Sequence, residues 1–134
     1  MTAPADHTTA PAPSRAAART VLVLRILLGL FLIAASALPK LLGEAYAVQI
    51  FDEIGAGDWF RYFIGVVELA GGIGLLVPAL AGPAAVGIVL LMVGAGITQV
   101  WVLDQPQYVI TPIIIAVLAA VIARHQFRYR RQAA

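Results

Sequence analysis

Long apolar segments separated by short polar stretches make up most of the chain. They lie at about residues 21–38, 61–80, 83–103 and 108–123. An α-helix rises about 1.5 Å per residue, so it needs roughly 20 apolar residues to cross about 30 Å of hydrocarbon. Each segment comes close to that length. The pattern therefore predicts an all-α integral membrane four-helix bundle.

The first of these segments also has features of a signal peptide, because two arginines precede it. A signal peptide has an apolar core of only about 7–15 residues and ends at a small-residue cleavage site. The segment at 21–38 is longer, contains Arg25, and is followed by Pro39 and Lys40. We therefore interpret it as the first transmembrane helix.

The polar stretch between the first two spans has a helical periodicity of its own. Its apolar side chains recur at the spacing of one helix face: Tyr46, Ala47, Ile50, Phe51 and Ile54. Most of its polar side chains fall opposite: Glu44, Gln49, Asp52 and Glu53. Gly55 and Gly57 follow, and Trp59 marks a return to the depth of the lipid headgroups. The pattern predicts a short interfacial amphipathic helix between helices one and two.

Composition agrees with a membrane protein and removes several kinds of chemistry. The chain is 61% hydrophobic and 12% charged, whereas soluble domains are about half apolar and a quarter charged. It has no cysteine, which excludes disulfides, thiolate nucleophiles and iron–sulfur ligation by this chain. Its two histidines, His7 and His125, lie outside the spans, so a bis-histidine haem is excluded. No metal-ligand spacing, catalytic triad or nucleotide motif is present. We predict no metal site, and the pattern favours a protein that is not an enzyme.

Positive charge gathers at the two ends of the chain. The net charge of +2 is small, and its distribution suits an anionic lipid surface better than nucleic acid. Acidic residues predominate in the loop between spans one and two and in the loop between spans three and four. The positive-inside rule then predicts that both termini are cytoplasmic. We expect a disordered cytoplasmic tail at residues 1–19, a four-helix transmembrane domain at 20–124 and a basic cytoplasmic tail at 125–134.

A single carboxylate, Glu68, lies inside the second span between the two interfaces. A charge at such a depth costs about 2.5–3.5 kcal/mol on insertion scales, so it needs a partner or is kept neutral. Side chains lean toward the N-terminus of their helix. In antiparallel spans one and two, Lys40 and Glu68 lean toward each other, whereas Arg25 leans toward the cytoplasm and is able to snorkel. We predict a Lys40–Glu68 pair in the outer half of the membrane, with Arg25–Glu68 as the alternative.

Small and polar residues share helix faces with these charges. The predicted intramembrane cluster comprises Glu68, Lys40, Arg25, Gln99 and Thr98. The last two either line the same cavity or hydrogen-bond to a neighbouring helix. The predicted helix-packing glycines are Gly29, Gly65, Gly72, Gly87 and Gly94. The cluster is either a structural ion pair that fixes the register of the bundle or a binding or proton-handling site, and the sequence leaves both open.

Several short motifs occur in a distinctive order along the spans. They are Leu24-Arg25-Ile26-Leu27-Leu28-Gly29, Pro39-Lys40-Leu41, Gly65-Val66-Val67-Glu68-Leu69-Ala70-Gly71-Gly72 and Met92-Val93-Gly94-Ala95. Over about residues 20–124 the arrangement resembles the DoxX family of small four-helix bacterial membrane proteins. The resemblance implies a protein of the bacterial cytoplasmic (inner) membrane. The family takes its name from a subunit associated with thiosulfate:quinone oxidoreductase and terminal oxidase systems, so it also suggests association with an oxidoreductase.

The residues and the resemblance together leave three functional hypotheses. The preferred one is a non-catalytic accessory or scaffold subunit of a membrane complex, with a redox complex as the case that the resemblance suggests. The second is a quinone- or lipid-binding oxidoreductase component with a pocket near Lys40 and Glu68; no cofactor other than this quinone is expected. The third is a transporter or binding protein for a small metabolite. The expected partners are the lipid bilayer, a protein of the complex and further copies of the chain, because glycine-rich faces permit homo-oligomers.

Overall fold

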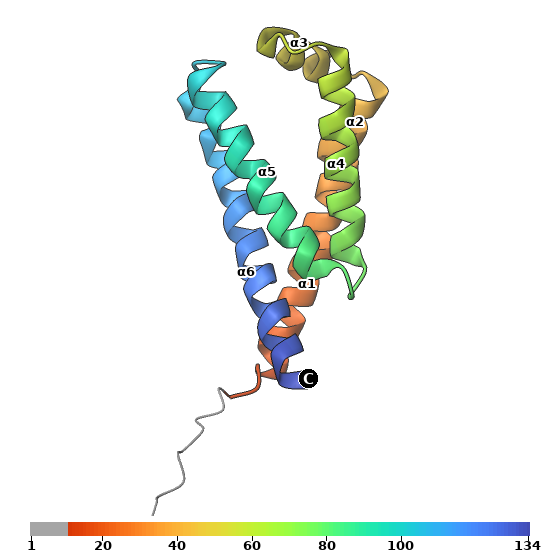
Figure 1. Ribbon diagram of the computed structural model, residues 1–134, viewed down its shortest axis with the longest axis vertical. Coiled ribbons are helices and arrows are strands. Elements are labelled where there is room, and N and C mark those ends of the chain that lie inside the picture. Colours follow the sequence, from red (N-terminus) through yellow and green to blue (C-terminus); the bar gives the residue numbers. More distant parts are fainter. Residues whose placement is uncertain (1–10) are drawn as a thin grey trace, which may run out of the picture.

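A computed structural model of the chain describes residues 11–134, and within that range it contains helices and no strands (Figure 1). In chain order the elements are α1 (Arg15–Phe31), the π-helix η1 (Leu32–Ala37), α2 (Leu38–Leu42), α3 (Ala45–Ile54), α4 (Asp58–Leu76), α5 (Ala81–Trp101), the 3-10 helix η2 (Pro106–Val109) and α6 (Ile110–Ala133).

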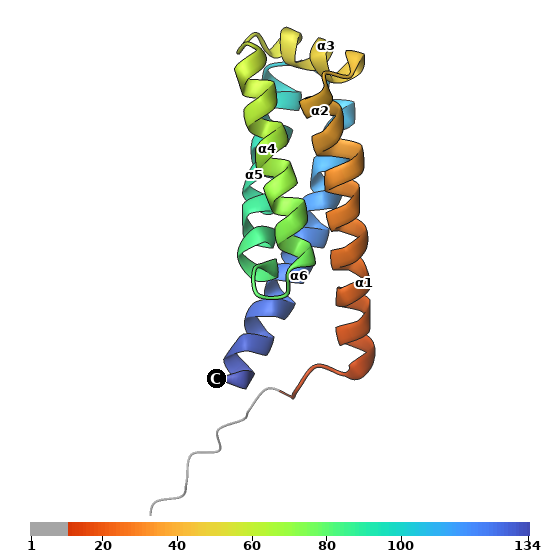
Figure 2. The same ribbon diagram turned by 90° about the vertical axis from the view of Figure 1, so that its right-hand side faces the viewer.

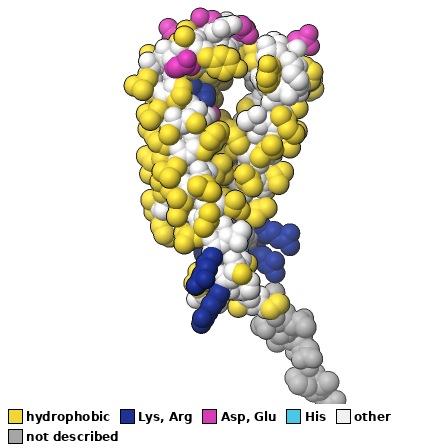
Figure 3. All heavy atoms as spheres, turned by 180° about the vertical axis from the view of Figure 1, so that it is seen from behind, with side chains coloured by type: hydrophobic (Ala, Val, Ile, Leu, Met, Phe, Trp, Pro, Cys, Tyr) yellow, Lys and Arg dark blue, Asp and Glu magenta, His cyan; other side chains and the backbone are white. Residues whose placement is uncertain are grey.

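Four helical stretches in the described part of the chain are long and apolar enough to cross a membrane. They are Arg15–Leu42, Asp58–Leu76, Ala81–Trp101 and Pro106–Ala133. The first of them combines α1, η1 and α2 without a break. Large apolar side chains cover the sides of the molecule (Figure 3), which suits a lipid environment and not water. The prediction of an all-α four-helix membrane bundle is confirmed.

Both ends of the described range are more helical than the sequence pattern suggested. Ser14 caps α1, because its Oγ accepts a hydrogen bond from the Ala17 amide at 3.1 Å. Alanines, which favour helices, fill the first turns that follow. The expectation of a disordered tail is therefore wrong for residues 15–19, and its part at 1–10 lies outside the described residues. At the other end, the basic segment at 125–134 continues α6 as far as Ala133.

The second span ends four residues before the predicted limit at Leu80. Helix α4 stops at Leu76, because Val77 adopts an extended conformation with φ −86° and ψ 116°. The next residue is Pro78, and the ring of a proline disfavours helical geometry in the residue before it. A short turn then leads into α5, in which Pro83 occupies the first turn, where no helical amide partner is lost.

Helix α3 lies across one end of the bundle, roughly perpendicular to the spans (Figures 1 and 2). Its two ends are marked by glycines in the left-handed region, Gly43 with φ 71° and Gly55 with φ 75°. Its apolar face is directed into the molecule, with Ala47 and Phe51 each only 8% exposed. The predicted amphipathic helix between helices one and two is confirmed.

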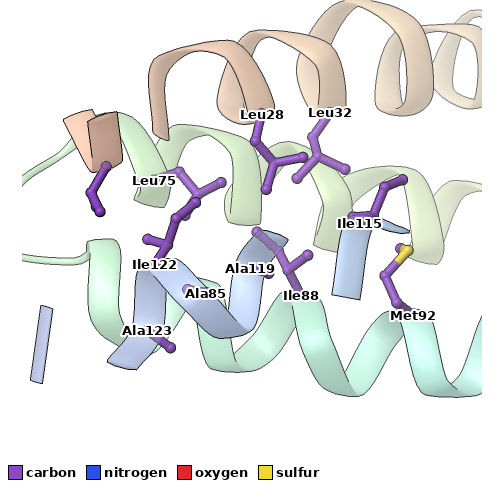
Figure 4. Close-up of a cluster of buried hydrophobic side chains, with 11 residues drawn as sticks. Leu28, Leu32, Leu75, Ala85, Ile88, Met92, Ile115, Ala119, Ile122 and Ala123 are labelled. Atoms are coloured by element: carbon purple, nitrogen blue, oxygen red, sulfur yellow. The ribbon is translucent and has the colours of Figure 1, made fainter. Parts of the chain in front are cut away.

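The packed core occupies the end of the bundle opposite α3. Helices α5 and α6 pack along each other, and α1 and α4 join them where the short α4–α5 turn brings the chain back. Figure 4 shows the side chains that meet there, among them Leu32, Leu75, Ile88 and Ile122, which are the largest fully buried ones. Lipid tails are as apolar as leucine, so these contacts stabilise the bundle through close packing and not through removal of water.

Toward α3 the two halves of the bundle separate. Helices α5 and α6 lean away from α1 and α4, and the gap widens to the end that α3 covers (Figure 1). The side chains do not fill this space. A cleft of about 540 Å³ remains there, with walls from η1, α2, α4 and α5 and a roof from α3.

Candidate functional site

Glycines bring the first and second spans into close contact on either side of Glu68. A Cβ on Gly72 would lie 2.9 Å from the Gly29 carbonyl oxygen, and one on Gly65 would lie 2.9 Å from Leu41 Cδ2 and 3.3 Å from Lys40 Cβ. Since ordinary Cβ contacts are longer, only glycine permits this approach. The expected packing role of Gly29, Gly65 and Gly72 is therefore visible in the structure.

The close approach places Lys40 against Glu68. Lys40 Nζ lies 2.8 Å from Glu68 Oε2, and the two side chains are 19% and 5% exposed. Within residues 11–134, no group donates a hydrogen bond to Glu68 Oε2, so the attraction at this contact is between charges. The ammonium group also donates hydrogen bonds to Oγ and to the carbonyl oxygen of Ser36, both at 3.1 Å. The preferred Lys40–Glu68 pairing is thus the one that the structure contains.

A π-helical turn supplies the carbonyl oxygen that Lys40 uses. Pro39 has no amide hydrogen, so it cannot complete the helical ladder with the turn before it. The ladder widens over η1, where the Leu38 amide donates to the Ile33 carbonyl five residues back. Helices commonly kink or bulge at proline for this reason. Ser36 lies in this π-helical segment, and both of its oxygens accept hydrogen bonds from the lysine ammonium.

Arg25 does not belong to this cluster, and the prediction that placed it there is wrong. Its side chain is 6% exposed, so it does not snorkel to the surface, and its Nε donates to the Leu75 carbonyl at 3.0 Å. Leu75 lies in the last turn of α4, where carbonyl oxygens have no partner within the helix. A cation at a helix C-terminus is also favoured by the helix dipole. Arg25 therefore caps α4 and leaves Glu68 to Lys40.

Arg61 is a buried cation whose role the sequence pattern did not indicate. It is only 4% exposed, and its Nη1 donates to the Lys40 carbonyl. Its guanidinium also lies 3.6 Å from Asp58 Oδ1 and 4.3 Å from the centre of the Tyr62 ring. Arg61 thus ties the start of α4 to the end of α2 and fixes the backbone of Lys40. The sequence feature that could have indicated this role is the position of Arg61 beside Tyr62 at the start of a span.

The cleft beside the ion pair is lined mostly by apolar residues. Its polar lining residues are Ser36, Lys40, Glu44, Tyr46, Glu68, Thr98 and Gln99. Figure 3 shows the hollow in the side of the molecule, with cationic and anionic side-chain atoms in its wall. Pockets that hold small organic molecules have volumes of about 300–1,000 Å³ and combine apolar walls with a few polar groups. The cleft has both properties.

Thr98 and Gln99 lie across the cleft on α5 and line the same space as Glu68. The Thr98 hydroxyl donates to the Gly94 carbonyl in its own helix at 3.0 Å.

Two of the predicted packing glycines, Gly87 and Gly94 on α5, have a different role from the expected one. A Cβ on Gly87 or Gly94 would meet no atom within 4 Å, because Gly87 borders a smaller groove between α4 and α5 and Gly94 borders the cleft. Their assignment as helix-packing residues is wrong within the chain, and Gly94 instead forms part of the cleft wall.

Fold and site together define a class, a multi-pass helical membrane protein with a cleft in one half of its bundle. Within that class the family is also established. Residues 23–122 match the model of the DoxX-like family, and the chain belongs to this family. No curated protein and no solved structure matches the chain.

Proposed function

We propose that this DoxX-like protein binds a small amphiphilic molecule in the membrane, with the polar head of the molecule beside Lys40 and Glu68. The observation that carries the proposal is the apolar cleft of about 540 Å³ with one buried ion pair in its wall. A pair that served only to hold two helices together would be enclosed by them. This pair borders open space.

The arrangement of charge supports a defined orientation in the bacterial inner membrane. Lysine and arginine side chains gather at the end where α1 begins and α6 ends, and acidic side chains gather at the end that carries α3 (Figure 3). By the positive-inside rule, the first end faces the cytoplasm and α3 faces outward. The cleft then lies in the outer half of the bilayer and opens toward lipid tails.

An isoprenoid quinone and a lipid are the candidate ligands that the family resemblance suggests. Both have a polar head and an apolar body, as the cleft requires. Redox chemistry in the cleft would need electrons from a partner protein. An accessory role in a membrane complex is therefore compatible with ligand binding, and the open cleft favours binding over a purely structural pair.

Two glycines of α5 provide a matched test of ligand binding. Gly87 and Gly94 are two helical turns apart, and a Cβ at either would meet no atom within 4 Å, but only Gly94 lines the cleft. Gly94→Phe fills the cleft, whereas Gly87→Phe adds the same bulk outside it. The probe is radiolabelled 4-hexylphenol, and the protein is held in lipid nanodiscs, with empty nanodiscs subtracted.

The cleft predicts that Gly94→Phe weakens binding of this probe at least about tenfold, equivalent to about 1.4 kcal/mol. Gly87→Phe is expected to leave binding within about twofold of the unmodified protein. Equal binding by both variants would refute the proposed site, as would the absence of any binding above empty nanodiscs.

A further inference from the structure

The hydrogen-bonding state of the ion pair determines what kind of head group the cleft accepts. An ammonium group has three N–H donors and no acceptor. Lys40 Nζ has three acceptor atoms around it at 2.8–3.1 Å, namely Oγ and the carbonyl oxygen of Ser36 and Oε2 of Glu68. Two of its donors are used by Ser36, and its charge is paired with that of Glu68, so a ligand finds no unpaired cation here.

The carboxylate of Glu68, in contrast to the lysine, has an oxygen that is available to a ligand. Its Oε2 is enclosed beside the lysine. Within residues 11–134, no group donates a hydrogen bond to the other oxygen, Oε1, and Oε1 is not among the fully enclosed polar atoms. An ionised carboxylate accepts hydrogen bonds at both oxygens. The open hydrogen-bonding position in this part of the wall is therefore an acceptor.

The other charges near the cleft exclude an anionic head. A second carboxylate, Glu44, also lines the cleft. The end of the molecule around α3 carries further acids and no free cation among the described residues, because Lys40 and Arg61 are both paired there. A cationic head is disfavoured for another reason. Lys40 already neutralises Glu68, so a cation placed beside this pair would lose its hydration without gaining an unpaired charge there, and the Glu44 carboxylate is engaged by the Ala47 amide at the start of α3.

From these hydrogen bonds and charges we infer that the cleft selects an uncharged amphiphile whose head group donates a hydrogen bond, such as a phenol or an alcohol. The donated hydrogen bond goes to Glu68 Oε1, and the apolar body lies among the side chains of α4 and α5. An amphiphile of the same shape that can only accept hydrogen bonds, such as an oxidised quinone, leaves Oε1 unsatisfied when it displaces water, so of a quinone and its quinol the cleft selects the quinol. The inference rests on the proposed binding function and specifies its ligand class.

The test compares two probes that differ by one methyl group, 4-hexylphenol and 4-hexylanisole, which lacks the O–H. Both are measured with the full-length protein in nanodiscs. A hydrogen bond to a charged group contributes about 1.5–3 kcal/mol, which corresponds to a preference for the phenol of about ten- to hundredfold. In the double variant Lys40→Met, Glu68→Leu the acceptor is absent, and the preference is expected to fall to about twofold or less.

The outcomes separate this inference from the function on which it rests. Equal, cleft-dependent binding of phenol and anisole, blocked by Gly94→Phe, would uphold binding and overturn the donor selectivity. Binding of neither probe would overturn both. A preference for the phenol that persists in the double variant would overturn the assignment of Glu68 as the acceptor. If the double variant does not fold, Glu68→Gln provides the same comparison, because its neutral amide oxygen is a weaker acceptor and should reduce the preference.

Discussion

The ion pair between Lys40 and Glu68 makes a quantitative prediction about stability. Lys40→Met and Glu68→Leu each remove one charge and keep most of the side-chain volume. Two unit charges 2.8 Å apart attract each other by about 6 kcal/mol at an effective dielectric constant of about 20. Desolvation of both groups offsets much of this attraction, so the pair adds little net stability compared with two apolar side chains.

Removing one partner has a much larger effect than removing both. Each single variant leaves a charge in an apolar wall, and breaking a fully buried pair costs about 3–5 kcal/mol. Because the Lys40 side chain keeps 19% exposure, we expect about 2–4 kcal/mol for each single replacement. The double variant should lie within about 1 kcal/mol of the unmodified protein, since neither charge is left unpaired.

The assay is reversible unfolding in mixed micelles of dodecylmaltoside and SDS, followed by far-ultraviolet circular dichroism. The control is Arg25→Met, because Arg25 is a buried cation on the same span that bonds to a carbonyl and not to Glu68. Combining Arg25→Met with Glu68→Leu should be additive within about 0.5 kcal/mol. If Lys40→Met and Glu68→Leu were additive as well, the two charges would not be coupled, and the reasoning would be refuted.

Three further predictions concern the packing of glycines between helices, the contact of Arg61 with the Lys40 backbone, and the orientation of the chain in the membrane. Gly29→Ala should destabilise the bundle by about 1–3 kcal/mol through overpacking, whereas Gly87→Ala should be neutral or stabilise it by up to about 1 kcal/mol; SDS titration checks both. Arg61→Met should lower Tm and weaken probe binding together, since the Lys40 backbone loses its tether, and a change in Tm alone would contradict this. The chain has no cysteine, so a membrane-impermeant maleimide applied to intact bacteria should label Asp52→Cys and not Ala134→Cys; the reverse pattern would contradict the orientation.

Much of the fold could be predicted because membranes restrict the options. Spans must be helical, so segment length and hydropathy determine the number of helices. The pairing of Lys40 with Glu68 could also be predicted, since side chains lean toward the N-terminus of their helix and the two spans are antiparallel. The ends of the helices were predicted less accurately. Capping by Ser14 and the effect of Pro78 on Val77 depend on local geometry that hydropathy does not report.

The pattern left a pocket near Lys40 and Glu68 open as one alternative, but it could not decide whether the cleft exists or which groups the buried arginines contact. Periodicity assigns a residue to a face, but it does not show whether a facing helix is close enough to contact that face. Gly72 meets another backbone and Gly94 meets open space, although both are glycines on small-residue faces. Arg25 and Arg61 likewise bond to carbonyl oxygens at helix ends, and which ends lie within reach is decided only by the packed structure.

The cleft opens through the side of the bundle, and this has a consequence for how its occupancy should be expressed. A ligand that arrives from lipid is drawn from a two-dimensional reservoir whose concentration is set by partitioning between water and bilayer. Each buried CH₂ group adds about 0.8 kcal/mol to that partitioning, so chain length alters the supply of ligand without altering any contact in the cleft. A site with modest intrinsic affinity is then filled by a scarce but strongly apolar compound. Dissociation constants for this protein are therefore comparable between ligands only when given as mole fractions in the membrane.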